Sequence, residues 1–544
     1  MNRPRPKPPS YYLYVPRLVH WTHEIHAKKL DPENKPRDVG KEALKKQKLF
    51  KGYEHLRRSL LWASLFTILP LLNSCTVGPN YTRPTLNIPQ NYTSQTTHPT
   101  AATKTKMGNA KHFQTNQQIA TQWWELFHSK PLNDLIITSF KHNPSIGVAQ
   151  EALHGALENI RVQQGAFYPA IGASFAPTKQ QIATILTSAL ASNQNNYYLF
   201  TGQVFVSYTA DVFGGIRRQV ESSIAQAETQ RFQLEATYLT LAANVVNAAI
   251  QQAALREQIK VTKQIISNQT RILAILRKQY KLGDTSLANV ELQEATLATS
   301  KSTLLPLEKQ LALQRDLLNA LTGRFPDDKR TPEFTFSTLH LPTELPLALP
   351  STLLEHRPDI RAAEEQMKTA NALIGVAIAN RLPNISLSNS TNTGTAATSL
   401  ATLLQTDTLF WSAAGIITQP IFQGGILLHK QRVAEAAYKQ AVEQYKLTVI
   451  NAFQNVTDTL KAIKLDTEAL NTASQTEQAT LRSFNISRRQ FQAGDVSILT
   501  LLTNEQMYKQ AQLTVIQAQA NRLSDSVALF QALGGSWWSK PSSG

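Results

Sequence analysis

The chain contains two copies of one unit, and this duplication constrains its fold more than any other feature. Residues 280–286 (YKLGDTS) return as residues 491–497 (FQAGDVS), so that Gly283 and Gly494 are 211 residues apart. A repeat of this size indicates a duplicated architecture and excludes a solenoid of small repeats. Further landmarks recur at nearly the same interval: Asn143-Pro144 with Arg357-Pro358, Gly214-Gly215 with Gly424-Gly425, and Leu321 with Leu533.

Each copy carries one long helical pattern. Over residues 234–280, positions in alternating steps of four and three form a coiled-coil seam, the stripe along which helices pack, for about seven heptads. The same register holds over residues 445–491, where the seam is more polar. We expect helices over 215–282 and 425–492, each about 100 Å long at the helical rise per residue. The returning helices, 286–321 and 497–533, are about half as long, and helices over 143–167 and 357–382 are expected to stack beyond their ends.

The Gly-Asp-x-Ser motif of each copy predicts the tip of a helical hairpin. A glycine readily takes the left-handed conformation that ends a helix, and Asp or Ser can cap the helix that follows. We favour the interpretation that the two aspartates cap helices over the alternative that they form a charged functional ring. The tip residues are Gly283, Asp284, Ser286, Gly494, Asp495 and Ser497.

Four strand candidates lie between the helices, two in each copy. Residues 204–212 and 409–418 alternate apolar and polar side chains, and shorter runs follow Pro169 and Pro383. The polar segments 180–196 and 389–406 are expected to be loops outside a cell. Two hairpins cannot close a barrel, and an open edge in lipid leaves backbone groups unpaired, so membrane insertion requires several protomers. Trp411 and Tyr197-Tyr198 fit either an aromatic belt at a membrane interface or packing on the sheet.

The N-terminus has the pattern of a bacterial export signal. Residues 1–58 carry 15 Lys and Arg against 6 Asp and Glu, so this segment is either a basic cytoplasmic tail or the result of a start site assigned too early. An uncharged stretch over 60–74 follows Arg57-Arg58 and is too short to span a bilayer comfortably. The histidines at 20, 23 and 26 are interpreted as solvated.

Cys75 is the only cysteine, which excludes an internal disulfide. Residues 72–75 (LNSC) resemble the lipobox of bacterial lipoproteins, in which the cysteine becomes the first residue and carries a diacylglycerol and an N-acyl chain such as palmitate. Asn73 departs from the usual pattern. Thr76 stands where inner-membrane lipoproteins often have aspartate, so the resemblance favours the outer membrane.

Catalytic patterns are missing from the sequence. It has no phosphate-binding Gly-Lys motif, no Ser/His/Asp context and no Cys/His metal spacing, so we expect neither an enzyme nor a metal site. The acidic pairs Glu364-Glu365 and Asp327-Asp328 are interpreted as solvated surface. The charge is spread along helices and does not indicate nucleic acid. We expect Trp123-Trp124 and Trp537-Trp538 to be buried where the chain ends meet the helices.

Several motifs together resemble the TolC-like outer membrane factors of the NodT/OprM type, which are efflux lipoproteins. The resemblance extends over about residues 72–538. Its most specific block is HRPDIRAAE at 356–364, and the others are CTVGPNYTRP at 75–84, WWxxF at 123–127, PIFxGG at 420–425 and ALGGxW at 532–537.

The resemblance implies a mixed α and β fold in which a homotrimer builds one channel. Each protomer contributes four transmembrane strands to a shared β-barrel and its long helical hairpins to a periplasmic α-barrel. The six tip residues would contact a periplasmic adaptor protein and, through it, an inner-membrane pump, with the RND class favoured. The number three follows from the resemblance alone.

Relatives carry an aspartate in the second hairpin that helps to form a constriction, and this chain departs from that pattern. Thr503 and Asn289 stand where the two copies would have the aspartate. We therefore expect polar and apolar packing to close the channel. A charged ring would need other carboxylates in place of the missing aspartates. The candidate gate residues are Asn289, Thr500, Thr503 and Glu505, and the substitutes for a charged ring are Asp284, Glu291, Asp495 and Glu505.

The expected organisation has seven segments. These are a basic extension (1–58), a signal peptide with lipobox (59–74), an extended tether (75–130), the first repeat (131–323), a linker (324–350), the second repeat (351–535) and a tail (536–544). The favoured function is the passive outer-membrane exit duct of a tripartite efflux system for small molecules. The alternatives are the exit duct of a type I protein secretion system and a periplasmic coiled-coil scaffold without a pore.

Overall fold

The computed structural model describes residues 76–89, 92, 109–115, 122–181, 196–340, 342–347, 350–387 and 392–535. All of them belong to one unit, residues 74–544. The predictions for the basic extension, the signal peptide, Cys75 and the tail with Trp537-Trp538 lie outside the described residues. None of the described helices contains an apolar stretch suited to crossing a membrane.

The long helices confirm the helical prediction in both copies. Helices α4 (Gly215–Lys281) and α8 (Ile426–Ala493) contain 67 and 68 residues, and α5 (Leu287–Leu321) and α9 (Ile498–Ala532) contain 35 each. Helices α3 (Pro144–Gly165) and α7 (Pro358–Ala379) contain 22 residues each. Two shorter helices, α2 (Lys130–His142) and α6 (Pro350–His356), precede α3 and α7.

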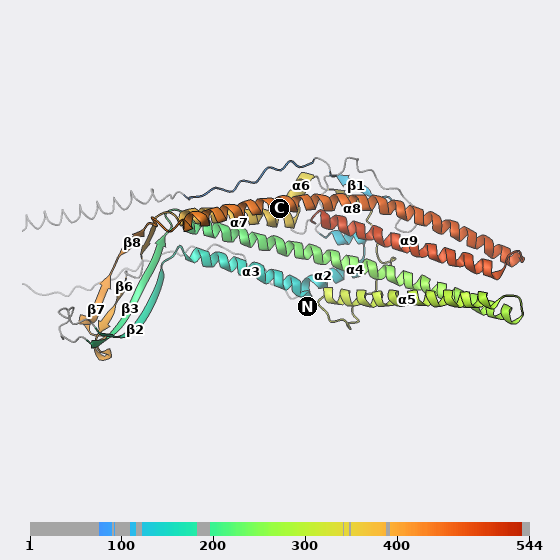
Figure 1. The fold of residues 1–544 in the computed structure, drawn as a ribbon, viewed down its shortest axis with the longest axis horizontal. Helices are drawn as coiled ribbons and strands as arrows, with labels where there is room; N and C mark the ends of the chain where they lie inside the picture. The colour runs from blue at the N-terminus through green and yellow to red at the C-terminus, as the bar shows by residue number, and fades with distance from the viewer. Residues whose placement is uncertain are drawn as a thin grey trace, which may run out of the picture. The chain divides into compact units, whose positions relative to one another are not determined.

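Helix α4 lies at the centre of the helical layer. It packs against α3 and α5 and also against α7 and α9, whereas the main contacts of α8 are with α7 and α9 (Figure 1). The predicted seam supplies much of the core: Val245, Ala248 and Leu255 are buried on α4, and Tyr445, Val449 and Ala452 are buried on α8. Small alanines at the seam let the helices approach closely. The layer therefore has two outer edges, one formed by α3 with α5 and the other by α8.

Matched side chains join the short helices to the returning ones. The Asn143 Nδ2 atom donates to the Leu321 carbonyl over 2.9 Å, and the Arg357 Nη1 atom donates to the Ala532 carbonyl over 2.6 Å. Asn143 and Arg357 are the N-cap residues of α3 and α7, while the two carbonyls lie at the ends of α5 and α9. These bonds confirm the predicted stacking in both copies.

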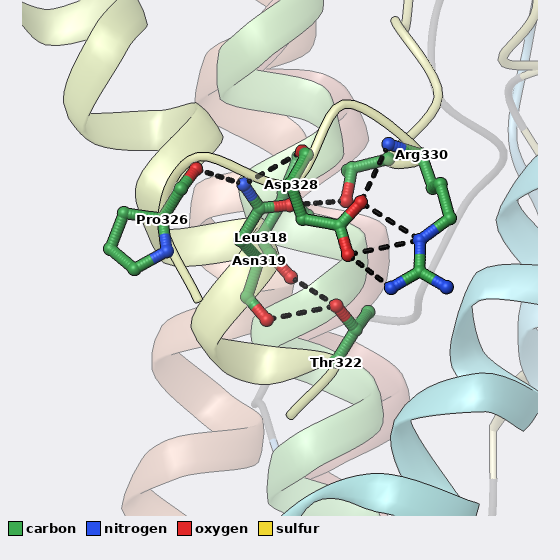
Figure 2. A network of polar contacts seen from close by, with 7 residues as sticks. Leu318, Asn319, Thr322, Pro326, Asp328 and Arg330 are labelled. Carbon is green, nitrogen blue, oxygen red and sulfur yellow. Dashed lines mark hydrogen bonds and ion pairs between the residues drawn. The ribbon is translucent and has the colours of Figure 1, made fainter. Parts of the chain in front are cut away.

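The chain turns back sharply after α5. Asn319 Nδ2 donates to the carbonyls of Pro326 and Asp328 over 2.5 and 3.2 Å, and the Arg330 guanidinium pairs with the Asp328 carboxylate (Figure 2). The Thr322 hydroxyl donates to the Leu318 carbonyl, so the last turn of the helix is also closed. This network holds the beginning of the linker against the end of α5. Asp327 is exposed, as the prediction of solvated surface expects, whereas Asp328 is half-buried and ion-paired, so the prediction is wrong for that residue.

The main sheet continues from the ends of the helices (Figure 1). Its longest strands, β2 (Ala170–Gln181) and β3 (Asn196–Ala210), pair antiparallel. Strand β3 then pairs with β5 (Asn384–Leu387) and β6 (Asn392–Ala397), which pair with β8 (Gly415–Thr418) and β7 (Leu409–Ser412) respectively. Across the sheet the order is therefore β2, β3, β5 with β6, and β8 with β7.

The prediction of one continuous strand over 409–418 is wrong, because β7 and β8 are separated by Ala413-Ala414. The pairing explains the break. Four residues, 388–391, separate β5 from β6. The gap is shorter on both neighbours of these strands: two residues separate the two paired parts of β3, and two residues separate β7 from β8. The register of the pairs made by β5 therefore differs by two residues from the register of the pairs made by β6, and the ladder is interrupted between them. An even shift keeps each side chain on its face of the sheet.

The prediction of a loop over all of 389–406 is wrong, because β6 lies in this segment and pairs with β3 and β7. Other short elements that the sequence analysis did not predict lie elsewhere in the chain. Strands β1 (His112–Thr115) and β4 (Glu344–Leu347) form a parallel pair. Among the described residues, the 3₁₀ helices are η2 (Trp123–Phe127), η4 (Leu400–Thr402) and η5 (Thr406–Thr408). Trp123 and Trp124 are buried as predicted, and Trp123 stacks on Phe530 of α9.

Candidate channel-forming sheet and helix tips

The strand register divides the side chains of the main sheet into an apolar and a polar face. Directly opposed residues of antiparallel strands lie on the same face, and the cross-strand pairs place Ile171 with Val206 and Ile385 with Ile417. Following these pairs across the sheet gives one face made largely of aliphatic and aromatic side chains: Ile171, Ala173, Phe175, Tyr198, Phe200, Val204, Val206, Tyr208, Ile385, Leu387, Leu409, Trp411 and Ile417.

The opposite face is mainly polar. It carries Ser174 opposite Gln203, Ala176 opposite Thr201, and Asn392 opposite Ser412, and the Ser412 hydroxyl donates to the Asn392 side chain over 2.8 Å. Alternation of apolar and polar side chains along each strand is typical of transmembrane strands, whose apolar face contacts lipid and whose polar face lines an aqueous lumen.

The apolar face is uncovered by the described residues. Ile171, Phe175, Leu409 and Ile417 are exposed, and Trp411 is 80% exposed. A monomer in water would rarely leave so large an apolar patch bare. The exposure of Trp411 favours the interfacial belt over packing on the sheet. At the far end of β2 and the start of β3, the Lys179 ammonium lies 5.2 Å from the Tyr198 ring, which stacks on Phe200.

Both hairpin tips have the glycine conformation that the sequence predicts. Gly283 and Gly494 have φ angles of 82° and 84°. The next backbone N–H groups, those of Asp284 and Asp495, donate to the carbonyls of Gln279 and Gln490 over 2.9 Å. This is the Schellman closure of a helix. All four residues are exposed.

The two tips differ in how the following helix begins. The Ser497 hydroxyl accepts the Thr500 N–H over 3.2 Å and caps α9. Ser286 is the N-cap residue of α5 but its side chain makes no capping bond. The structure thus assigns the N-cap positions to the serines, and the proposed capping role of Asp284 and Asp495 is wrong at these positions.

The candidate gate residues lie on the first two turns of α5 and α9. Asn289, Thr500 and Thr503 are exposed, as is Glu291, and Glu505 is half-buried. Asn289 Nδ2 donates to the Thr285 hydroxyl over 3.0 Å. None of these side chains is buried within the described protomer.

One residue that connects the two hairpins was missed by the sequence analysis. Asn268 of α4 is buried, and its Nδ2 atom donates to the Leu502 carbonyl of α9 over 3.1 Å. This bond joins the first hairpin to the second. The heptad pattern gave no signal for it, because Asn268 lies between the seam positions Ile266 and Gln269.

Glu364 and Glu365 are buried, so the prediction of a solvated pair is wrong. The Glu364 carboxylate pairs with Arg83 over 3.2 Å and accepts the Tyr81 hydroxyl over 3.4 Å. The Glu365 carboxylate pairs with Lys368 over 2.7 Å. Within the described residues, no cluster of three or more His, Cys, Asp or Glu side chains is arranged to hold a metal ion.

Long helical hairpins joined to a sheet with an uncovered apolar face define an outer-membrane channel. A profile of the family described as outer membrane efflux protein matches residues 135–324 and 349–535, which is more than half of the chain. The chain therefore belongs to the outer membrane efflux protein family.

Curated relatives and solved structures agree with this assignment. The chain is 26% identical to the pyoverdine export outer membrane protein OpmQ of Pseudomonas putida, over 76% of this chain and 88% of OpmQ. It is 25% identical to the probable outer membrane lipoprotein SilC of Salmonella typhimurium, over 87% of this chain and 98% of SilC.

Two solved channels show the same fold. The outer-membrane channel OprN superposes with a TM-score of 0.72 at 24% identity, over 85% of this chain and all of that one. The open state of the Neisseria gonorrhoeae MtrE channel has a TM-score of 0.72 at 23% identity, over 85% of this chain and 99% of that one. The protein is an outer-membrane efflux duct with a large periplasmic portion.

Proposed function

We propose that three copies of this chain form the passive exit duct of a tripartite efflux system for small molecules. The observation that carries the proposal is the sheet, with its exposed apolar face and its polar opposite face. Its outer strands are β2 on one side and β7 with β8 on the other, and these have no further partners among the described strands. Open edges are not tolerated in lipid, so copies would pair edge to edge and close one shared barrel.

Exposed apolar side chains on the two edges of the helical layer also support the joining of copies into a closed ring. The edge formed by α3 and α5 exposes Val148, Val162 and Leu313, and the edge formed by α8 exposes Val433 and Ile450. Because each protomer would present one edge of each kind, copies join head to tail, which generates a ring. The number three is taken from the resemblance to outer membrane factors.

The tips would contact a periplasmic adaptor and, through it, an inner-membrane pump. The residues proposed for this contact are Gly283, Asp284, Ser286, Gly494, Asp495 and Ser497, all of which are exposed. We propose that the duct performs no catalysis of its own and that the pump, with the RND class favoured, supplies the energy and the choice of cargo. An exit duct for a type I protein secretion system is the alternative with the same architecture.

We also propose that Cys75 carries a diacylglycerol and an N-acyl chain that anchor the protein to the outer membrane. The support is the lipobox-like sequence at 72–75. Loss of metabolic lipid label in Cys75→Ala tests this point.

The function is tested by crosslinking the protein in its native envelope and identifying the captured proteins by mass spectrometry. The expected result is a periplasmic adaptor together with an inner-membrane pump. Purified protein in a planar bilayer should conduct ions. Capture of peptidoglycan-linked proteins alone, with no conductance, would support the scaffold without a pore.

A further inference from the structure

A buried lysine joins the segment 109–115 to helix α9. Lys111 is fully buried, and its Nζ atom donates to the Arg522 carbonyl over 3.0 Å and to the Ser526 hydroxyl over 2.8 Å. In return, the Nη2 atom of the fully buried Arg522 donates to the Asn109 carbonyl over 2.9 Å. Each of the two chain segments therefore supplies a donor for the other.

The same segment is tied to the linker between the two repeats. The His112 N–H donates to the Thr343 carbonyl over 2.8 Å, and strand β1 pairs with β4 in parallel. Among the described strands, these two pair only with each other. The bonds made by Lys111 and Arg522 therefore connect a two-stranded sheet, which includes part of the linker, to the second hairpin.

Two carboxyl groups lie beside this connection. Asp466 lies 27 residues before Ala493, where α8 ends at the tip. Asp525 lies 27 residues after Ile498, where α9 begins. The antiparallel hairpin thus brings both residues to one level, and a hydrogen bond joins their side chains. Two carboxyl groups form such a bond only when they share a proton.

The surroundings of Asp525 also disfavour its charged form. Its side chain is 9% exposed, and its Oδ2 atom has no hydrogen-bond donor among the described residues. A buried carboxylate oxygen without a donor is costly. The pKa of the Asp525 carboxyl is raised to about 7, mainly by burial and then by Asp466, while Lys111 and Arg522 oppose the rise.

The sign of the pH dependence follows from these shifts. Because the pKa of Asp525 lies above its ordinary value of 3.8, its contribution is full below that value and is lost as the pH rises through about 7. The pKa of Lys111 is lowered to about 7, mainly by burial and by Arg522, so Lys111 acts above neutral pH and in the opposite sense. Between pH 5 and 7 the carboxyl pair therefore dominates.

We propose that Lys111, Asp466 and Asp525 form a proton-dependent clasp, which holds the segment 109–115 on the second hairpin while the carboxyl pair shares a proton and loosens when that proton is lost. Loss of the proton to water leaves two carboxylates in contact, and their repulsion separates α8 from α9 at this level. The acceptors of Lys111 lie on α9 and move with it. Lys111 is thus a positioning residue, and the inference does not depend on the proposed export function.

Hydrogen exchange in the purified full-length protein tests the clasp. The measurement is the protection factor of the amides of residues 111–115 at pH 5.5 and pH 7.5, which corrects for the intrinsic effect of pH on exchange. In the wild type we expect severalfold lower protection at pH 7.5, because the fastened state is favoured in acid. Equal protection at both pH values would overturn the proposal.

Asp525→Asn is the deciding variant, because a carboxamide does not ionise and can still donate a hydrogen bond to Asp466. Its protection should be equal at the two pH values. Asp466→Asn repeats the test from α8, so that a folding defect in one variant does not decide the result. His112→Gln is the matched control: His112 is exposed and titrates in the same range, and its loss should leave the pH dependence intact. A pH dependence that persists in both Asn variants, or disappears in His112→Gln, would contradict the clasp.

Discussion

Glu235 shows how strongly the central helix constrains a single ionisable group. Its side chain lies on α4 and is 6% exposed, 2.7 Å from the Arg231 guanidinium. The pKa of its carboxyl is raised to about 7, mainly by burial; nearby Glu228 adds to the rise, while Arg231 and Arg361 oppose it. Near neutral pH the folded protein therefore holds a proton that the unfolded chain releases.

Because of this bound proton, we predict that the free energy of unfolding depends on pH. The contribution of Glu235 is full below its unfolded pKa of 4.5 and is lost as the pH rises through about 7. Since one pKa unit corresponds to about 1.4 kcal/mol, the loss has a ceiling of about 3 kcal/mol per protomer. Glu235→Gln should therefore gain thermal stability relative to wild type at pH 8 and little at pH 5. Equal melting shifts at both pH values would contradict the assignment, and the exposed Glu291→Gln is the control.

Buried polar pairs were the hardest residues to predict. Glu364 and Glu365 look like solvated acids in the sequence, and both are buried. The apolar periodicity of helix α7 does not mark either residue as buried. Glu364 is balanced by Arg83, which comes from an N-terminal segment without regular secondary structure. Such a segment has no periodicity from which its path can be inferred, so its partners were not predictable.

At the scale of elements, the two tips offer a matched pair. Ser497→Ala removes the hydroxyl that caps α9, and the loss of an N-cap costs about 1 kcal/mol. Ser286→Ala removes a hydroxyl that makes no capping bond, so it should cost less. Amide exchange in the first turn of the following helix should accelerate about fivefold for Ser497→Ala, because about 1 kcal/mol corresponds to that factor. Similar acceleration in both variants would show that the caps do not distinguish the tips.

A charge introduced at Thr503, near the second tip, tests whether this residue lines the gate. Thr503 is exposed beside the buried Leu502. If three copies bring Thr503 to the lumen, Thr503→Asp adds a ring of carboxylates, and divalent cations should then block the bilayer conductance of the variant at concentrations that leave the wild type open. Thr514→Asp, an exposed position farther along α9, is the control. Unchanged cation sensitivity would exclude Thr503 from the gate.

Helices were more predictable than strands for a physical reason. The seam over 234–280 has about seven heptads, and each adds evidence for one register, so the limits of α4 and α8 were predicted to within a residue or two. The break between β7 and β8 coincides with a two-residue change of register against the neighbouring strands β5 and β6, which appears only once the strands are paired. Strand pairing is a long-range property that local alternation does not encode.

At the scale of the whole molecule, the duplication leaves unlike edges. Val162 of α3 and Val433 of α8 are both 68% exposed, and both lie near the sheet, since α3 leads into β2 and α8 follows β8. Head-to-tail closure would bury both. Val162→Glu and Val433→Glu should each abolish the trimer in native mass spectrometry, because a buried unpaired carboxylate is costly. Ile224→Glu, on the central helix α4, should leave the trimer intact.

Mixing the two edge variants distinguishes the mode of assembly. If unlike edges join, the only intact interface in the mixture lies between the α8 edge of the Val162→Glu protomer and the α3 edge of the Val433→Glu protomer. That pair has a damaged edge at each end, so assembly should stop at a mixed dimer. If like edges joined instead, each variant would form a homodimer through its undamaged edge and no mixed species would appear. Coexpression with two mass tags reads out the difference directly, and a mixed dimer is the expected result.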